Sequence, residues 1–328
     1  MNEYVLELGK KSKDASKKLI KIDTVTKNNF FSILKNNLDK FRDEIKKQNQ
    51  IDIKNGEKKG LTKAFLDRLL LTDSRIDGML ESIEIVRNFK DPIGEIVEGF
   101  RHSKGMEIKK VRVPLGVIAM IYESRPNVSI DASILCLKAS NSIILRGGSD
   151  AINSNKVLVN IVRESLVEAG LPEDAVILME KTEREHVNDL LKLNDYIDVA
   201  IPRGGKGLKK AIMENATIPV IETGAGVCHT YFDEFGDVEK GKNIVFNAKT
   251  RRVSVCNSLD CLVINERRLL DLPVLCQMMA DKNVVIYADE KAFSVLDGRY
   301  PAALLQKATA ESYGIEFLDY KMSVKTVA

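Results

Sequence analysis

Cys256 has the surroundings expected of a reactive thiol. Three cations, Lys249, Arg251 and Arg252, precede it, and an apolar segment, 261–264, follows it. Nearby positive charge favours the thiolate, which is the nucleophilic form of a cysteine whose free pKa is about 8.5. The same pattern fits a small buried side chain beside a solvated basic loop, and most unpaired cysteines are core residues. The choice between these two interpretations depends on the rest of the chain.

Two residues at the ends of predicted strands could assist such a nucleophile. Asn127 follows a strand predicted at 117–121, and its amide could polarise a carbonyl oxygen. An asparagine in this position also commonly caps the next helix. Glu222 ends a strand predicted at 219–221, where it could act as a general base or pair with a nearby cation.

Two glycine-rich turns follow other predicted strands. The first contains Arg146, Gly147, Gly148 and Ser149, and the second contains Arg203, Gly204 and Gly205. Glycine lets backbone amides approach a phosphate closely, and a helix N-terminus adds its own attraction. Neither turn has Gly-x-Gly-x-x-Gly spacing, and Gly-Gly after a strand is usually a plain tight turn. Two such turns with arginines in one sheet leave a dinucleotide site and plain turns both open.

The elements that must position these residues alternate between strand and helix. Apolar runs of strand length lie at 117–121, 142–145, 175–178, 199–201 and 219–221, with helical patterns such as 155–169 between them. Such continuous apolar strands predict a parallel sheet covered on both faces. Ligands bind at the carboxyl ends of the strands in this architecture. A nucleotide site is therefore expected at the carboxyl ends of these strands.

Three further regions complete the predicted organisation. The segment before residue 92 reads as helices, and residues 93–113 read as a two-stranded arm with at least one solvated face. An isolated hairpin is marginal in water, so we expect the arm to pair with another subunit. A second α/β unit begins near residue 225, with strands at 230–232, after Cys256, at 283–287 and at 322–327, and helices at 237–248 and 266–280.

The composition excludes several classes of protein. A length of 328 residues predicts two domains, and 50 basic against 47 acidic side chains give no reason to expect nucleic acid or a membrane as partner. Five cysteines without a Cys-x-x-Cys pair argue against a disulfide framework, and Cys228-His229 is not metal-ligand spacing, so no metal is expected. The N-terminus is no signal peptide, and the longest apolar stretch, 113–122, is too short to span a bilayer. A cytoplasmic location is therefore expected.

Seven short motifs in order give a more specific indication. They are 60–72 with its Leu-Asp-Arg-Leu, 113–118, 122–128 (Tyr-Glu-Ser-Arg-Pro-Asn-Val), 144–148, 201–205, 219–224 with Cys228-His229, and 247–250 before Cys256-Asn257. Together they resemble the γ-glutamyl phosphate reductase (glutamate-5-semialdehyde dehydrogenase) family of the aldehyde dehydrogenase superfamily. The likeness covers the whole chain.

The resemblance implies a fold and a reaction. The fold would be α/β and aldehyde dehydrogenase-like. Two Rossmann-like parallel-sheet domains are expected: a dinucleotide-binding domain at 1–92 and 114–225, and a catalytic domain at 226–328. The hairpin at 93–113 would be an oligomerisation arm. The reaction would be the NADPH-dependent reduction of L-glutamyl 5-phosphate to L-glutamate 5-semialdehyde through a cysteine thioester, the second step of proline biosynthesis. A homo-oligomer is implied, and glutamate 5-kinase is a candidate partner.

The resemblance also assigns residues. Cys256 falls on the catalytic nucleophile and Asn127 on the oxyanion donor. Glu222 falls on a strand-end glutamate that acts as a base when water hydrolyses the acyl enzyme. Here the acyl partner would be phosphate rather than water, so the role of Glu222 stays open. The two glycine turns, with Arg146, Ser149 and Arg203, fall on the NADP(H) site. Arg125, Arg251 and Arg252 are candidates for binding the substrate's phosphate or carboxylate, because arginine binds either group bidentately.

The chain departs from the family pattern in two places. Residues 251–253 are Arg-Arg-Val where the family usually has Gln-Arg-Pro, which frees the loop before Cys256. The sequence also ends at Ala328, so the catalytic domain is expected to be incomplete at its C-terminus. Two alternatives follow: an inactive truncated fragment or partner of a separate C-terminal piece, and an aldehyde dehydrogenase acting on another acyl group.

Overall fold

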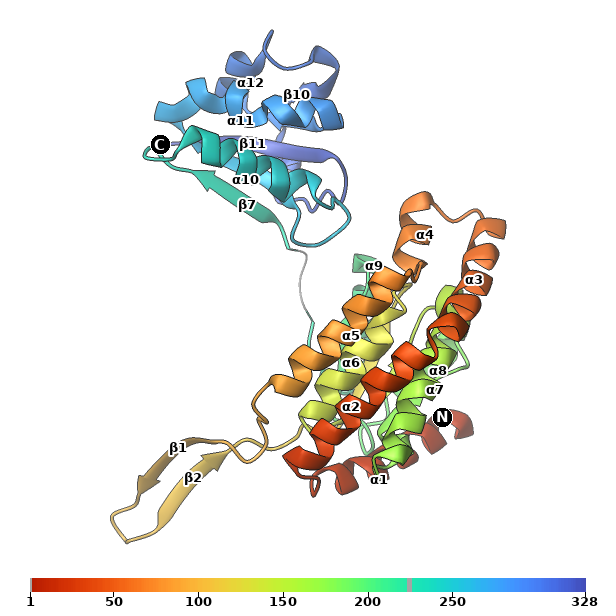
Figure 1. Cartoon of the computed structure of the whole chain (residues 1–328). Helices are drawn as coiled ribbons and strands as arrows, with labels where there is room; N and C mark the ends of the chain where they lie inside the picture. The colour runs from red at the N-terminus through yellow and green to blue at the C-terminus, as the bar shows by residue number, and fades with distance from the viewer. Residues whose placement is uncertain (1, 223–225) are drawn as a thin grey trace. The chain divides into compact units, whose positions relative to one another are not determined.

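The computed structural model describes residues 2–222 and 226–328, except for the side chains of residues 64 and 206. Two compact units are present, Met1–Glu222 and Thr223–Ala328, called here the N-terminal and C-terminal units (Figure 1). The expected domain boundary near residue 225 and the end of the 219–224 motif lie outside the described residues. In the described part of the chain, no helix is both long and apolar enough to cross a membrane.

A four-stranded parallel sheet forms the centre of the N-terminal unit. Its order is β5-β4-β3-β6, with bounds β3 Val117–Tyr122, β4 Ser142–Arg146, β5 Val176–Leu178 and β6 Val199–Arg203. Successive side chains of a strand point to opposite faces. Accordingly Val117, Ala119 and Ile121 join one buried cluster, whereas Ile118 and Tyr122 join another. This division explains why the strand is apolar without interruption.

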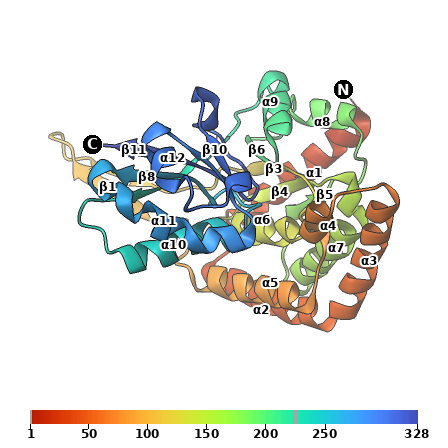
Figure 2. The same ribbon diagram turned by 90° about the horizontal axis from the view of Figure 1, so that it is seen from above.

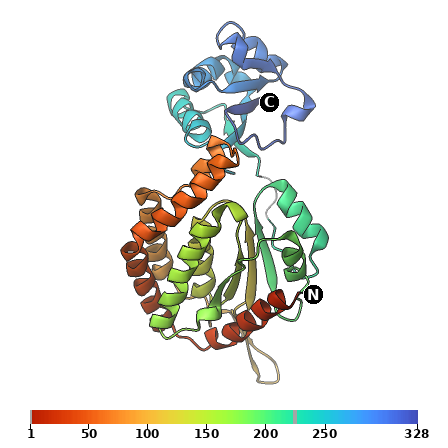
Figure 3. The same ribbon diagram turned by 90° about the vertical axis from the view of Figure 1, so that its right-hand side faces the viewer.

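Helices cover both faces of this sheet, as the views in Figures 2 and 3 show. The cluster with Val117 includes residues of α1 Glu3–Leu19, α8 Arg184–Leu190 and α9 Lys206–Asn215. The opposite cluster includes residues of α2 Thr24–Lys40, α3 Arg42–Lys58, α5 Asp73–Asn88, α6 Asn127–Lys138 and α7 Ile152–Glu168. The short α4, Lys63–Leu69, follows α3. The helical prediction for the first ninety residues is thus confirmed.

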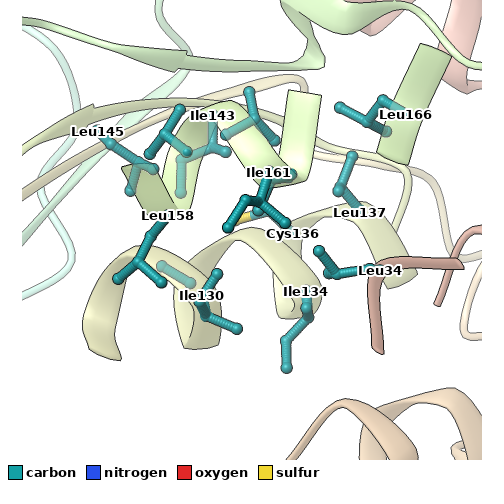
Figure 4. Close-up of a cluster of buried hydrophobic side chains, with 14 of the residues drawn as sticks. Leu34, Ile130, Ile134, Cys136, Leu137, Ile143, Leu145, Leu158, Ile161 and Leu166 are labelled. Carbon is teal, nitrogen blue, oxygen red and sulfur yellow. The ribbon is translucent and has the colours of Figure 1, made fainter. Parts of the chain in front are cut away.

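Figure 4 shows part of the larger cluster, in which α6, α7 and β4 meet. Ile130 and Ile134 of α6 belong to one continuous apolar core with Ile143 of β4 and Leu158 of α7. Cys136 belongs to the same core, and burial raises the pKa of its thiol to about 12. Cys136 is thus a core residue of the N-terminal unit.

The segment 93–113 forms an antiparallel ribbon of β1 Ile96–Arg101 and β2 Glu107–Val111. Every residue of both strands is exposed. The apolar side chains of Ile96 and Phe100 are each 56% accessible. The ribbon projects from the other elements of the N-terminal unit (Figure 1). It is called the arm below.

The C-terminal unit contains a second parallel sheet, of five strands in the order β10-β9-β11-β8-β7. The bounds are β7 Cys228–Phe232, β8 Leu259–Asn265, β9 Val285–Ala288, β10 Leu305–Lys307 and β11 Lys321–Val327. Helices α10 Val238–Thr250, α11 Leu272–Cys276 and α12 Glu290–Leu296 accompany it. Their apolar residues and those of the strands form a separate core.

Two predicted elements differ from those observed. The expected strand at 219–221 is reduced to a single bridge between Ala200 and Val220. The expected helix at 266–280 is broken into two 3₁₀ segments around the short α11. Pro273 lies in the first turn of α11, and proline has no N–H to continue a preceding helix.

Candidate functional site

Cys256 lies in the connection between α10 and β8, and its side chain is exposed. Cys136, Cys261 and Cys276 are buried, and Cys228 is intermediate. The interpretation of Cys256 as a core residue is therefore wrong. The residues 251–258, called the cysteine loop below, present this thiol to solvent. Arg251 and Arg252 of the same loop are exposed as well.

Lys249 does not belong to that exposed surface. Its side chain is fully buried, and Nζ donates a hydrogen bond of 2.8 Å to the carbonyl oxygen of Leu259. Burial lowers the pKa of the ammonium, while Asp260 and Asp319 raise it. Lys249 thus joins the two ends of the cysteine loop. Of the three cations that precede Cys256 in the sequence, only Arg251 and Arg252 are exposed to solvent.

Hydrogen bonds hold the peptide planes on both sides of Cys256. The amide of Ser258 donates to the carbonyl oxygen of Val255 at 3.0 Å. The thiol of Cys228 donates to the carbonyl oxygen of Cys256, with Sγ and O 3.2 Å apart. No described residue accepts a hydrogen bond from the amide of Cys256. Since the described peptide bonds are trans, that amide points opposite to the Val255 carbonyl, and it is available to an oxyanion.

Asn127 begins α6 and makes no cap, because the N-cap position is Pro126 and no side chain bonds to the helix amides there. The capping interpretation is therefore wrong. Instead, Nδ2 donates to Oδ2 of Asp131, one turn further along, at 2.9 Å. Burial raises the pKa of Asp131, and the Asn127 hydrogen bond lowers it. This bond fixes the orientation of the amide and leaves its second N–H free for a ligand.

The two glycine turns lie on either side of β3 at the carboxyl edge of the sheet. Arg146 at the end of β4 is opposite Ile121, and Arg203 at the end of β6 is opposite Tyr122. The sheet therefore brings both predicted cofactor turns to the strand end that leads to Asn127. Both turns therefore lie at the same edge of the sheet as the end of β3.

The first turn is shaped largely by its own core. A Cβ at Gly147 would lie 2.2 Å from Nδ2 of Asn155 and 3.0 Å from the Tyr122 ring. Arg146 donates from Nη2 to the carbonyl oxygen of Thr182 at 2.5 Å, whereas its buried Nε has no partner among the described residues. Burial, followed by the charge of Arg184, lowers the pKa of Arg146.

Ser149 is exposed and lines an open hollow of about 270 Å³ beside Gly148. Lys58, the last residue of α3, and Lys59 after it line the same hollow. The start of α7 is already satisfied there, because Asp52 accepts hydrogen bonds from the amides of Asn153 and Ser154. Lys59 already pairs with Asp150 at 2.7 Å, which leaves the exposed Lys58 rather than these amides as the group available to an anion.

The second turn accommodates a carboxylate of the protein. The amide of Gly205 donates to Oε1 of Glu123 at 3.2 Å. A Cβ at Gly204 would lie 2.7 Å from Cδ of Glu123 and 2.7 Å from Leu208. The start of α9, which the sequence pattern assigns to a phosphate, thus binds Glu123. Sequence reasoning missed this role, although Glu123 stands in the 122–128 motif next to a strand end.

The remaining predicted residues are distributed between the units. Glu222 is exposed, and Arg125 is half-buried in the turn before α6. These two, Asn127 and both glycine turns belong to the N-terminal unit, whereas Cys256, Arg251 and Arg252 belong to the C-terminal unit.

Comparison with known proteins decides the family. The chain is 49% identical over 325 residues to a γ-glutamyl phosphate reductase of Francisella philomiragia, covering 99% of this chain and 77% of that protein. The chain belongs to the γ-glutamyl phosphate reductase family. It is accordingly an oxidoreductase of proline biosynthesis, a glutamate-5-semialdehyde dehydrogenase, as the motifs indicated. No family model matches the chain.

Solved structures support the same assignment. The γ-glutamyl phosphate reductase of Thermotoga maritima superposes with a TM-score of 0.90 at 38% identity, covering 98% of this chain and 77% of that one. An engineered glycolyl-CoA reductase with bound NADP⁺ superposes with a TM-score of 0.66 at 16% identity, covering 98% and 76%. The second likeness shows the fold alone. The predicted aldehyde dehydrogenase-like α/β fold is confirmed.

Proposed function

We propose that this reductase converts L-glutamyl 5-phosphate to L-glutamate 5-semialdehyde and phosphate, with NADPH as reductant and Cys256 as covalent nucleophile. The observation that carries the proposal is the exposed thiol of Cys256 in a loop whose backbone is held on both sides of it. Identity to γ-glutamyl phosphate reductases supports the substrate. The cytoplasm, which is reducing, suits a protein with five free cysteines.

In the first half of the reaction, the thiolate of Cys256 attacks the acyl phosphate carbonyl. A C–S bond forms, and the C–O bond to phosphate breaks, so phosphate leaves with the electron pair. The amide of Cys256 and the amide side chain of Asn127 would stabilise the oxyanion of the tetrahedral intermediate. Covalent catalysis divides one difficult step into two easier ones.

In the second half, the thioester on Cys256 would be reduced by hydride, which is the chemistry that bound NADPH would supply. The resulting thiohemiacetal expels the Cys256 thiolate and becomes the aldehyde. Because phosphate rather than water is the acyl partner, Glu222 is not needed to activate water here. It remains a candidate base for any hydrolysis of the thioester.

The residues at the carboxyl edge of the N-terminal sheet fit a dinucleotide. Arg146 has a buried Nε without a partner among the described residues, and Arg203 lies across β3 from it. These two cations would hold the phosphates of NADPH, with Gly147, Gly148 and Ser149 beside them. The amide of Gly205 becomes a phosphate donor once Glu123 leaves it. An NADP⁺-bound protein of the same fold supports a nicotinamide cofactor.

Arginines are proposed to bind the rest of the substrate. Arg125 precedes Asn127, and Arg251 and Arg252 lie in the cysteine loop. A guanidinium pairs with a carboxylate or phosphate through two parallel hydrogen bonds. The acyl phosphate itself must come from a kinase acting on the side-chain carboxylate of glutamate, which makes glutamate 5-kinase the candidate partner.

The arm is proposed to bind a second copy of the chain. Its strands expose Ile96, Val97, Phe100, Ile108 and Val111, and a two-stranded ribbon is marginal in water by itself. Light scattering of the purified protein would measure the oligomeric state. A monomer at working concentrations would contradict this part of the proposal.

The reaction is best tested in the oxidative direction. Purified protein is mixed with glutamate semialdehyde, NADP⁺ and either phosphate, coenzyme A or no acyl acceptor, and NADPH is followed by absorbance. We expect turnover that requires phosphate and that Cys256→Ala abolishes, while Cys276→Ala, a core variant, retains it. Turnover that persists in Cys256→Ala, or that prefers coenzyme A or water, would contradict the proposal.

A further inference from the structure

Buried hydrogen bonds within the C-terminal unit hold both ends of the cysteine loop. Lys249 precedes the loop and Leu259 follows it, and the 2.8 Å hydrogen bond from Nζ to the Leu259 carbonyl joins them in the buried interior. Ser258 is also buried, and its amide closes a turn onto Val255. Between these two hydrogen bonds, the loop is exposed to solvent at Cys256.

A third hydrogen bond restrains Cys256 itself, and its donor lies at the start of β7. The thiol of Cys228 lies 3.2 Å from the carbonyl oxygen of Cys256 and donates to it. A Cβ at Gly226 would lie 3.3 Å from the same oxygen, so the chain before β7 approaches this carbonyl closely. The direction of a residue's carbonyl is determined by its ψ angle. The Cys228 thiol therefore restrains the ψ of Cys256.

The position of Cys228 is fixed in turn by a buried carboxylate. Asp260 is 2% exposed, and its Oδ2 accepts from the Cys228 amide at 3.4 Å. Its other oxygen accepts from the amide of Phe317 at 3.0 Å. The register between β7 and β8 shifts between Cys228 and His229, next to this contact.

The environment keeps the thiol of Cys228 protonated. Burial raises its pKa, and the negative charges of Asp260, the Cys256 thiolate and Glu316 raise it further. A thiol must keep its proton in order to donate a hydrogen bond. The two acids that raise it, Asp260 and Glu316, belong to the same unit as Cys228. The two neighbouring cysteines therefore differ: Cys228 keeps its proton and donates a hydrogen bond, whereas Cys256 presents an exposed thiol.

We infer that Cys228 is a positioning residue for the nucleophile, whose thiol orients Cys256 through its backbone carbonyl. The inference rests on the proposed function, in which Cys256 attacks the acyl phosphate. Catalytic attack needs a defined direction of Sγ, because reactivity depends on the alignment of the reacting atoms. Alkylation by a small reagent needs little more than an exposed thiolate. A positioning role should affect the first much more than the second.

The test compares the wild-type chain with Cys228→Ala, Cys228→Ser and the control Cys276→Ala. The control also removes one thiol from the same unit, but from its core and away from the cysteine loop. Measured quantities are kcat and KM for phosphate-dependent NADP⁺ reduction, the rate of Cys256 alkylation by iodoacetamide from mass spectrometry, and the melting temperature.

We expect Cys228→Ala to lower kcat by about fivefold, the effect of one weak hydrogen bond. KM and the alkylation rate should stay within about twofold of wild type. Cys228→Ser retains a donor and should recover most of kcat. Cys276→Ala should lower the melting temperature through its cavity and leave kcat near wild type.

The pH profile gives a signature that a purely structural role lacks. Because the pKa of Cys228 is raised, its donor persists through neutral pH and is lost only as pH rises through that pKa. Wild-type kcat should therefore fall at alkaline pH, and the Cys228→Ser profile should lack this fall, since serine does not titrate.

Two failures are distinguishable. A wild-type chain without phosphate-dependent turnover overturns the proposed function and this inference with it. An active wild type in which Cys228→Ala has unchanged kcat, or in which Cys228→Ala and Cys276→Ala lose kcat equally, overturns the inference alone.

Discussion

The loops at the ends of the two parallel sheets differ in whether their backbone amides already donate hydrogen bonds to side-chain carboxylates. In the N-terminal unit, Glu123 accepts from the amide of Gly205, and Asp52 accepts from those of Asn153 and Ser154. In the C-terminal unit, no described residue accepts from the amide of Cys256. At the edge of the N-terminal sheet, side-chain carboxylates already accept from the backbone amides. In the cysteine loop, the amide of Cys256 has no acceptor among the described residues.

This difference separates two ways of preparing a site. An amide already bonded to a carboxylate costs little in the unliganded protein, but a phosphate must displace that carboxylate. An amide left open is ready for an oxyanion without rearrangement, which is the arrangement that stabilises a transition state most effectively. Under the proposed function, the cofactor edge would therefore exchange its carboxylates for phosphates, whereas the nucleophile would be preorganised. Four substitutions test this contrast.

The largest effect is expected at Asn127, the predicted second oxyanion donor. Asn127→Ala removes the amide and should lower kcat by about 100- to 1,000-fold, the range found when one oxyanion donor is lost. KM should change much less, because the donor acts on the transition state. Steady-state kinetics at saturating NADP⁺ measure both. A kcat within tenfold of wild type would leave Cys256 as the main donor and remove Asn127 from the mechanism.

The next effect concerns the fit of Glu123 into the second turn. Gly204→Ala places a Cβ 2.7 Å from both Cδ of Glu123 and Leu208, so either the carboxylate or the helix must shift. We expect a loss of about 2 kcal/mol of stability and a melting temperature lower by about 4–8 °C. Gly207→Ala is the matched control, since a Cβ there meets nothing within 4 Å and alanine favours a helix. Equal melting temperatures for the two variants would show that the turn is not tightly occupied.

A smaller effect is expected at Glu123 itself. Glu123→Gln removes the negative charge beside the Gly205 amide and should tighten NADPH binding by about fivefold, because a phosphate no longer competes with a carboxylate. Fluorescence titration of NADPH measures the change. Glu185→Gln, on the exposed surface of α8, serves as the control. Weaker binding in Glu123→Gln would mean that the carboxylate supports the cofactor instead of excluding it.

The smallest effect is a pH dependence of stability at Asp131. Burial raises its pKa, so the fold favours the protonated form. The resulting contribution to stability is fully present below the unfolded pKa of about 3.9 and is lost as pH rises through the folded value. Asp131→Asn should therefore raise the melting temperature by about 1–2 °C at pH 7. This gain should shrink as pH falls toward 4, which thermal scans across pH would check.

Local pattern predicted most of the fold and little of the bonding at the site. The strand at 117–121 could be predicted because its residues are apolar on both faces, and the sheet confirms it as Val117–Tyr122. The three-residue β10 was missed because so short a run carries no period. Pro273 was a readable signal that the helix at 266–280 would break, and it was overlooked.

The contacts that sequence could not supply join residues far apart in the chain. Glu123 meets Gly205 across 82 positions, and Cys228 meets Cys256 across 28. No period or spacing encodes such pairs. The Asn127–Asp131 bond is different, since its spacing of four is a helical neighbour relation that could have been recognised. The assignment of catalytic roles to these residues stays a prediction.

The arm also supplies a reporter of assembly. Arg101 and Lys104 are exposed at its tip, where trypsin cleaves after basic residues. A chain whose arms are covered by a partner would resist a nick there, whereas an isolated chain would be cut first at this place. The size of the earliest tryptic fragments therefore reads out subunit pairing directly in a crude preparation, without purification or an activity assay.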